Sequence, residues 1–300
     1  AEWPAVRVGP PNKPRVGYLY VLAAACLWGL LGVVSKAAFE QGVSPLEVAF
    51  WRAALGAVLF GAQAFLIQKM LVLRKDLLPV AGFGLVGISL FYGAYQLAIQ
   101  SGGAALASVL LYTAPAIVAL LSWLFLREPM NAFKLGAVAL TLLGVAAVSM
   151  QGGGVDITLP AIFWGLVSAL TYATYYLFGK LYLHKYTTPT VFLYALPVGA
   201  LGLLPFVDFA PKTAEAWGAI AFLTVVSTFV AVTLYFAGLR RLEATRASVV
   251  ATLEPVVAAF AAWLWWGERF SLLGYLGAGL VLAGVLVMVL RPQPRVASNR

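Results

Sequence analysis

Aromatic, hydroxyl and carboxyl side chains interrupt several long apolar stretches of this sequence. Tyr92, Tyr95 and Gln96 share one helical face, and Trp164 is also compatible with a membrane-interface position. Rings bind apolar groups and hydroxyls bind polar ones, so these side chains together suit a small amphipathic ligand. The predicted ligand-contacting residues are Trp28, Tyr92, Tyr95, Gln96, Ser108, Tyr112, Trp164, Ser168, Tyr172, Tyr175, Tyr235, Ser248 and Glu254.

Glu254 is the one carboxylate near the middle of such a stretch. A charge at a membrane centre costs about 2.5–3.5 kcal/mol on insertion scales. The carboxyl is therefore expected to be protonated, paired or open to a wet pocket. Three roles remain open: binding a substrate amine, coupling to protons, or bonding a carbonyl next to Pro255.

Two prolines lie about halfway along apolar stretches and are predicted hinges. Pro115 and Pro255 each remove a backbone donor and displace the carbonyl four residues earlier, which belongs to Leu111 and Ala251. Inside a membrane such a carbonyl needs protein or water as a new partner. A packing kink is the plainer interpretation of each proline alone.

Five other charged positions allow structural interpretations. Lys36 and Lys180 lie near opposite ends of their stretches, where they could attract anions at two mouths or extend toward water. Arg52 is expected to pair with Glu47 or Glu40, in a structural role. Glu128 follows Arg127, and Glu268 precedes Arg269. Both glutamates are expected to act as helix caps or as gate pairs.

The composition excludes a soluble globular protein. Of the 300 residues 62% are hydrophobic and 10% charged, against about 25% charged in soluble domains. A single histidine (His184) and a single cysteine (Cys26) exclude an internal disulfide and a Cys/His zinc site. The net charge of +9 comes from short clusters between apolar runs, so no nucleic-acid partner is expected. No catalytic residue, metal or cofactor is predicted, and an intramembrane enzyme or an open channel is disfavoured.

Apolar runs of the length that crosses a bilayer predict an all-α integral membrane protein. About 20 residues span the hydrocarbon core, and only helices or closed barrels satisfy the backbone there. Ten such runs are expected to be transmembrane helices, at residues 17–38, 46–67, 77–99, 104–126, 132–150, 161–183, 190–207, 216–239, 244–266 and 272–290.

The distribution of cations predicts the orientation of these spans. Alternate loops and the two tails on one side carry 15 lysines and arginines, and the loops on the other side carry 2. Because cytoplasmic loops are enriched in such residues, both termini are expected in the cytoplasm.

The chain also repeats itself. An offset of 140 residues places Tyr95 on Tyr235, Pro115 on Pro255 and Trp123 on Trp263, and Ala-Ser-Val recurs at 107–109 and 247–249. We expect a cytoplasmic tail (1–16), a five-helix repeat (17–150), a linker (151–160), a second five-helix repeat (161–290) and a cytoplasmic tail (291–300). Since five is odd, the second repeat is inverted, with a substrate site between the halves.

These features resemble the EamA branch of the drug/metabolite transporter superfamily, in overall look closest to YddG-type bacterial exporters of aromatic amino acids. The resemblance rests on the inverted repeat and on Ala-Ser-Val, proline, tryptophan and glutamate recurring in each half. It implies a basket with a central cavity walled by spans one, three, four, six, eight and nine, with spans five and ten peripheral. It implies no catalytic residue.

The sequence therefore favours an exporter of small amphipathic metabolites, foremost aromatic or apolar amino acids, working by alternating access as facilitated diffusion or exchange. The alternatives are cationic drug efflux through Glu254 and exchange of phosphorylated sugars or nucleotide-sugars. The expected location is the bacterial inner membrane, with the lipid bilayer and a small-molecule substrate as partners. The oligomeric state is not determined by the sequence, and a monomer is compatible with it.

Overall fold

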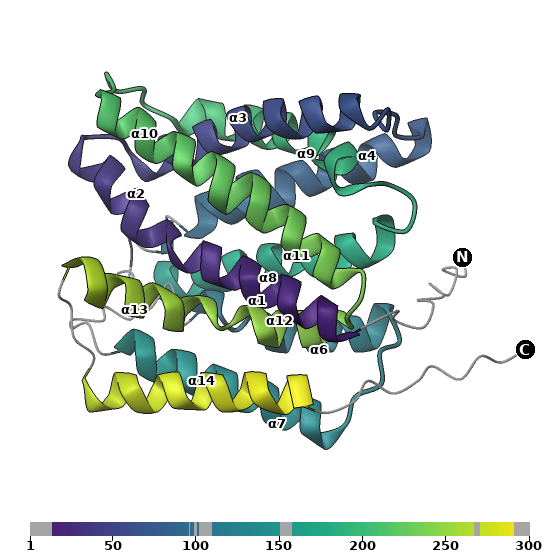
Figure 1. The fold of residues 1–300 in the computed structure, drawn as a ribbon, viewed down its shortest axis with the longest axis vertical. Helices are drawn as coiled ribbons and strands as arrows, with labels where there is room; N and C mark the ends of the chain where they lie inside the picture. Colours follow the sequence, from purple (N-terminus) through teal and green to yellow (C-terminus); the bar gives the residue numbers. More distant parts are fainter. Residues whose placement is uncertain are drawn as a thin grey trace, which may run out of the picture.

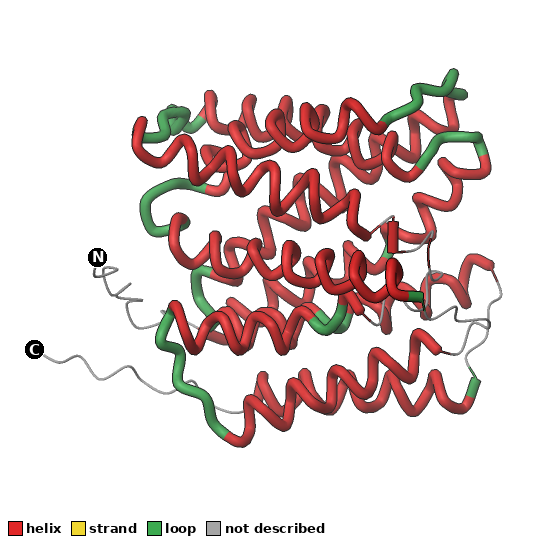
Figure 2. The backbone as a smooth tube through the Cα atoms, turned by 180° about the vertical axis from the view of Figure 1, so that it is seen from behind, coloured by secondary structure: helices red, strands yellow, loops and turns green. Residues whose placement is uncertain are grey.

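The computed structural model describes residues 14–95, 97–98, 101, 110–150, 158–266 and 271–290, and this part of the chain forms helices and loops without a strand. The helices run side by side in one bundle (Figures 1 and 2). The helices of the first half are α1 (Pro14–Gly29), α2 (Leu31–Glu40), α3 (Pro45–Leu66), α4 (Arg74–Phe83), α6 (Ala114–Phe125) and α7 (Ala132–Ser149). Those of the second half are α8 (Leu159–Tyr182), α9 (Thr188–Leu203), α10 (Ala214–Phe222), α11 (Ala231–Leu239), α12 (Ala244–Ala251), α13 (Glu254–Trp266) and α14 (Leu272–Leu290).

Three shorter helical segments extend α4, α9 and α10, and residues 91–95 are helical as well. The π-helical segments η1 (Gly84–Leu90) and η4 (Leu223–Val230) continue α4 and α10, and the 3-10 turn η3 (Leu204–Phe206) follows α9.

Several helices begin at a polar side chain that caps them. Ser44, Asn131, Thr158, Thr187 and Thr213 each accept a hydrogen bond from the backbone N–H three residues later. This satisfies one of the N–H groups that the first helical turn leaves without an intrahelical partner. The starts of α3, α7, α8, α9 and α10 are therefore encoded locally.

Six helices among the described residues are long and apolar enough to cross a membrane. They cover Pro45–Leu66, Arg74–Tyr95, Leu159–Tyr182, Thr188–Phe206, Ala214–Leu239 and Leu272–Leu290. The expected ten complete spans are not confirmed. The expected first span is divided at Leu30 into α1 and α2, and the expected ninth span is divided by a turn at Thr252–Leu253. The expected fourth span is divided by a turn at Tyr112–Thr113 and lies partly outside the described residues.

The two halves depart from regular α-helix at equivalent positions, about 140 residues apart in the sequence. The π-helical segments η1 and η4 lie 140 residues apart to within one residue. A turn at Tyr112–Thr113 precedes Ala114 and Pro115, and its counterpart at Thr252–Leu253 precedes Glu254 and Pro255. Each proline thus stands in the first turn of a new helix, the position where its missing N–H costs least.

Helix packing follows the same pseudo-symmetry. α7 packs on α14 at one edge of the bundle, and α3 packs on α9 at the other (Figure 1). Between these edges, α1 packs on α11 and α13, as α8 packs on η1 and α6. The first turn of α1 meets the last turn of α14, where the Tyr18 hydroxyl donates to the Met288 carbonyl at 2.8 Å. Both ends of the described chain therefore lie at the same end of the bundle.

Glycines make the contact between α7 and α14 close. A Cβ on Gly144 would lie 2.6 Å from the Gly277 carbonyl oxygen and 2.7 Å from the Val281 nitrogen. The reciprocal contact is present, because a Cβ on Gly284 would lie 2.9 Å from the Ala137 carbonyl oxygen. Small residues allow this approach of two membrane helices.

Gly144→Ala is expected to lower the free energy of unfolding by about 1–3 kcal/mol, because the backbone of α14 must move away. Gly136→Ala is the matched control on the same helix, since its Cβ would meet nothing within 4 Å. The measurement is the thermal unfolding midpoint of the purified protein in detergent. Equal midpoints for the two variants would contradict the packing described.

Candidate functional site

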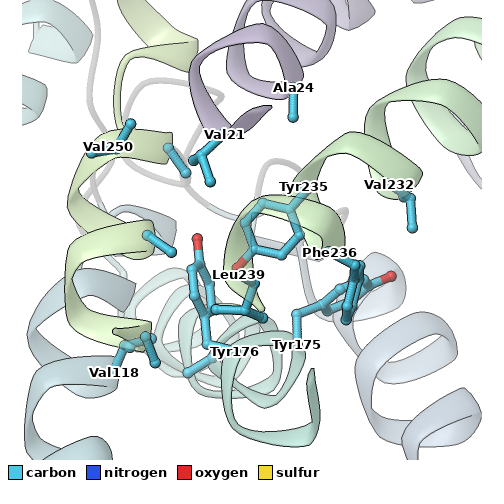
Figure 3. Close-up of a cluster of buried hydrophobic side chains, with 14 of the residues drawn as sticks. Val21, Ala24, Val118, Tyr175, Tyr176, Val232, Tyr235, Phe236, Leu239 and Val250 are labelled. Atoms are coloured by element: carbon cyan, nitrogen blue, oxygen red, sulfur yellow. The ribbon is translucent and has the colours of Figure 1, made fainter. Parts of the chain in front are cut away.

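A cluster of aromatic rings joins both halves at the centre of the bundle. Tyr235 of α11 lies between Trp28 of α1 and Tyr176 of α8, with ring centroids 5.1 and 5.5 Å from its own. The hydroxyl ends of Tyr235 and Tyr176 lie near each other in Figure 3. Rings from α1, α8 and α11 therefore meet at one point.

The cluster extends along α8 toward the third expected span. The Tyr176 hydroxyl donates to the Tyr172 hydroxyl at 3.4 Å, and Phe91 stacks on Tyr172 at a centroid distance of 5.1 Å. Phe91 in turn stacks on Tyr92 at 5.2 Å. Tyr175 packs edge-on against Phe83 at 5.0 Å and makes a side-chain contact with Tyr92.

Glu254 lies at the same centre, as the first residue of α13. Its carboxyl makes a side-chain hydrogen-bond contact with the hydroxyl of Tyr112, which directly precedes α6. Tyr95 and Tyr172 also lie close enough to this carboxyl to interact with it electrostatically. The breaks before α6 and α13 thus face each other, and the N-terminal end of α13, which carries a partial positive charge, favours a carboxylate there.

Several of these side chains keep exposed surface although they pack against the core. Trp28, Tyr92, Tyr95, Tyr172 and Glu254 are half-buried, and the four aromatic ones contact the main buried cluster. Tyr112, Tyr175 and Tyr235 are buried. The cluster thus contains both buried side chains and side chains with accessible surface.

The hydroxyl of Tyr235 lies against the Tyr176 hydroxyl but makes no hydrogen bond of normal geometry among the described residues, and the side chain is 1% exposed. Leaving a buried hydroxyl unpaired costs about 1–3 kcal/mol. Neighbouring Trp28 is already engaged, because its indole N–H donates to the Ser227 carbonyl at 2.9 Å. The Trp28 ring is thus held in place beside Tyr235, whose hydroxyl is left with unsatisfied hydrogen-bonding capacity.

The predicted serines and Trp164 do not join the cluster by any described contact. Ser168 donates to the Gly165 carbonyl at 2.7 Å and Ser248 to the Thr245 carbonyl at 2.8 Å, each within its own helix. Trp164 packs on Phe163 at 5.0 Å. The predicted contacts Gln96 and Ser108 lie outside the described residues.

Lys180 is not a free cation at a mouth. It is 7% exposed, and its ammonium donates to the Leu242 carbonyl, which ties α8 to the turn between α11 and α12. The side chain of Lys36 lies outside the described part of the structure.

Glu128 acts as a cap, but for a helix of the other half. Its carboxylate accepts from the backbone N–H of Ala244 at 2.7 Å, and from the N–H and hydroxyl of Thr245 at 3.3 and 3.0 Å. It therefore caps α12, whose start it meets across the bundle. Glu268 lies outside the described residues.

Arg52 was expected to pair with Glu47 or Glu40, and this is wrong. Glu47 pairs with Lys212, while the Arg52 Nε donates to the Thr228 hydroxyl at 3.0 Å. The guanidinium carbon lies 5.5 Å from the centroid of the Tyr92 ring and acts electrostatically on Glu254. Arg52 thus belongs to the central cluster.

Three members of the cluster were not among the predicted contacts: Arg52, Tyr176 and Phe91. Tyr176 was visible as a flank residue of a tyrosine-rich helix, and Phe91 adjoins Tyr92. Arg52 could have been predicted as a site residue because it is a charged residue inside an apolar stretch, and charged residues within a membrane usually serve function. Within the described residues, no group of three or more His, Cys, Asp or Glu side chains could hold a metal ion.

Comparisons with known proteins agree with this architecture. The sequence matches the EamA-like transporter family twice, over residues 15–150 and 159–290. It is 31% identical to a protein of Archaeoglobus fulgidus named an uncharacterized transporter, covering 91% of this chain and 96% of that one. It is 28% identical to the uncharacterized inner membrane transporter YicL of Salmonella typhimurium, covering 95% and 98%. A solved crystal structure has the same fold, with a TM-score of 0.80 over 91% of this chain and 96% of that one at 18% identity.

Proposed function

Because the chain belongs to the EamA-like transporter family, we propose that it exports small amphipathic metabolites, above all amino acids with aromatic or apolar side chains. The supporting observation is the convergence of Trp28, Tyr172, Tyr235 and Glu254 from both repeats at one half-buried centre. Rings there suit an apolar side chain, and hydroxyl and carboxyl groups suit a polar backbone.

The proposed site consists of the predicted residues that meet there: Trp28, Tyr92, Tyr95, Tyr112, Tyr172, Tyr175, Tyr235 and Glu254. The mechanism is alternating access, as facilitated diffusion or exchange. The matched breaks before Pro115 and Pro255 support hinges at these positions, because a turn without continuous helical hydrogen bonds bends at low cost.

The chain is a multi-pass membrane transporter, and we place it in a bacterial inner membrane with both termini in the cytoplasm. A relative is named an inner membrane transporter. The Tyr18–Met288 contact supports two ends on one side of the membrane. The 15-to-2 distribution of lysines and arginines supports the cytoplasm as that side.

Counterflow in liposomes tests the substrate class. Vesicles with the purified protein and unlabelled L-phenylalanine inside are expected to accumulate labelled L-phenylalanine from outside. Empty vesicles provide the background, and labelled aspartate tests whether an apolar side chain is required. Accumulation no faster than in empty vesicles would remove amino acids of this class as substrates.

Tyr235→Phe is expected to slow phenylalanine transport about three- to tenfold, because one ligand hydrogen bond is worth about 0.5–1.5 kcal/mol. The thermal unfolding midpoint is expected to stay or rise, since among the described residues the hydroxyl makes no hydrogen bond of normal geometry. Tyr182→Phe is the control, made on a ring stacked on Phe178 near the end of α8. Loss of stability with unchanged transport would show that the hydroxyl serves the fold instead.

Cationic drug efflux through Glu254 is the second candidate, supported by the half-buried position of this carboxylate among aromatic rings. It predicts that Glu254→Gln abolishes proton-driven uptake of a labelled organic cation into inverted vesicles. Retained uptake would exclude a proton-coupling carboxylate at this position.

A further inference from the structure

Arg52 is a buried guanidinium whose charge the protein leaves uncompensated at short range. The side chain is 7% exposed, and its hydrogen bond to Thr228 uses only Nε. Among the described residues no carboxylate forms an ion pair with it, because Glu47, one turn earlier, pairs with Lys212. Within that part of the chain no hydrogen bond is found for its two terminal nitrogens, and neither is among the sealed polar atoms without a partner, so both keep some accessible surface.

The position of Thr228 places this charge near mid-depth. Thr228 belongs to η4, near the middle of the helical stretch Ala214–Leu239 that is long enough to span a membrane. A buried, unpaired guanidinium there is costly, and intramembrane charges are retained mainly where they serve a substrate or ion.

The second charge of the cluster has the opposite sign and lies on the other repeat. Glu254 interacts electrostatically with Arg52, while Tyr92 lies under the guanidinium and Tyr112 faces the carboxylate. The unpartnered hydroxyl of Tyr235 lies beside Trp28 in the same cluster. One cation, one anion and a wall of rings therefore surround one region.

We infer that Arg52 and Glu254 form a dipolar binding site for a zwitterion, with Arg52 holding an α-carboxylate and Glu254 an α-ammonium group. The inference rests on the proposed function and narrows its substrate class to free amino acids with intact termini. A guanidinium with two free terminal nitrogens can bind a carboxylate through two parallel hydrogen bonds. A phosphate dianion fits less well, since it would meet a carboxylate as well as the single guanidinium.

The competing explanation is that Arg52 only tethers α3 to η4 through Thr228. The tether and the binding site differ in what they predict for ligands that lack one charge. If Arg52 is only a tether, its replacement changes the affinity for every ligand equally. If it is part of a binding site, its replacement weakens only the ligands that carry a carboxylate.

The test measures equilibrium binding of L-phenylalanine, phenethylamine and 3-phenylpropionate to the purified full chain in detergent. Wild type is expected to bind phenylalanine at least about tenfold more tightly than either analogue, since each lacks one charge-assisted contact. Arg52→Gln is expected to weaken the binding of phenylalanine and of phenylpropionate about tenfold. It is expected to leave the affinity for phenethylamine within about twofold of the wild-type value. Glu254→Gln is expected to weaken the binding of phenylalanine and of phenethylamine and to leave the binding of phenylpropionate unchanged.

Thr228→Val is the matched variant for the tether, because it removes the bond to Nε and keeps both charges. It is expected to preserve the preference for phenylalanine over phenethylamine. Equal weakening of all three ligands by Arg52→Gln, or wild-type binding of phenethylamine as tight as that of phenylalanine, would overturn the inference. If the Arg52 variant does not fold, the wild-type ligand series still decides between these outcomes. Failure of the wild type to bind any of the three would instead refute the proposed substrate class, and this inference with it.

Discussion

Glu128→Ala is expected to reduce the free energy of unfolding by about 3–5 kcal/mol, the range for removing one partner of a buried charge network. Glu128 is 8% exposed and accepts hydrogen bonds from Ala244 and from both donors of Thr245. Its charge also acts on the buried ammonium of Lys180. Removing the carboxylate leaves the buried N–H groups of Ala244 and Thr245 without this acceptor and the Lys180 ammonium without its nearby negative charge.

The thermal unfolding midpoint in detergent measures this effect. Glu215→Ala is the matched control, because Glu215 is an exposed acid in the first turn of α10. A midpoint for Glu128→Ala equal to that of the control would mean that the cap of α12 contributes little.

This carboxylate belongs to a set of buried polar contacts at the end of the bundle where both ends of the described chain lie. Glu243 pairs with Lys134 at 3.0 Å and with Arg246 at 2.8 Å. Arg246 also donates to the Tyr18 hydroxyl and the Met288 carbonyl, at 2.9 and 2.8 Å. Charges from both repeats thus close this end, and alternating access would require some of these contacts to break.

Glu47→Gln is expected to cost a similar amount, about 3–5 kcal/mol, at the opposite end of the bundle. Glu47 is fully buried, pairs with Lys212, and accepts from the Ala210 N–H at 3.2 Å. The Lys212 ammonium lies 5.4 Å from the ring centroids of both Trp51 and Trp217. Neutralising Glu47 leaves this ammonium among rings, which compensate a desolvated cation by only about 2 kcal/mol.

A double-mutant cycle checks whether the cost belongs to the pair. Lys212→Met removes the other charge and keeps an apolar stem, so the double variant should be destabilised less than the two single variants together. Simple additivity would show that Glu47 acts through Ala210 and Trp51 and not through Lys212.

Much of the general character of the protein could be predicted from the chain alone. Composition and run length predict an all-helical membrane protein, because hydrocarbon admits no unpaired backbone. The 140-residue offset predicts two repeats, which the double match to the EamA-like family confirms. Tyrosine spacing along one helix predicts a shared face, since the helical period depends only on local geometry.

Other features were decided by tertiary structure, and Arg52 illustrates the reason. Its neighbours in sequence suggested Glu47, whereas its actual partner Thr228 lies 176 residues away. In the same way Glu128 caps a helix that begins 116 residues later. The helical period determines which residues share a face of one helix, but the rotation and depth of each helix in the bundle determine which faces meet. Those depend on packing such as the Gly144–Gly277 contact, so only the folded chain places a cation and a carboxylate at one centre.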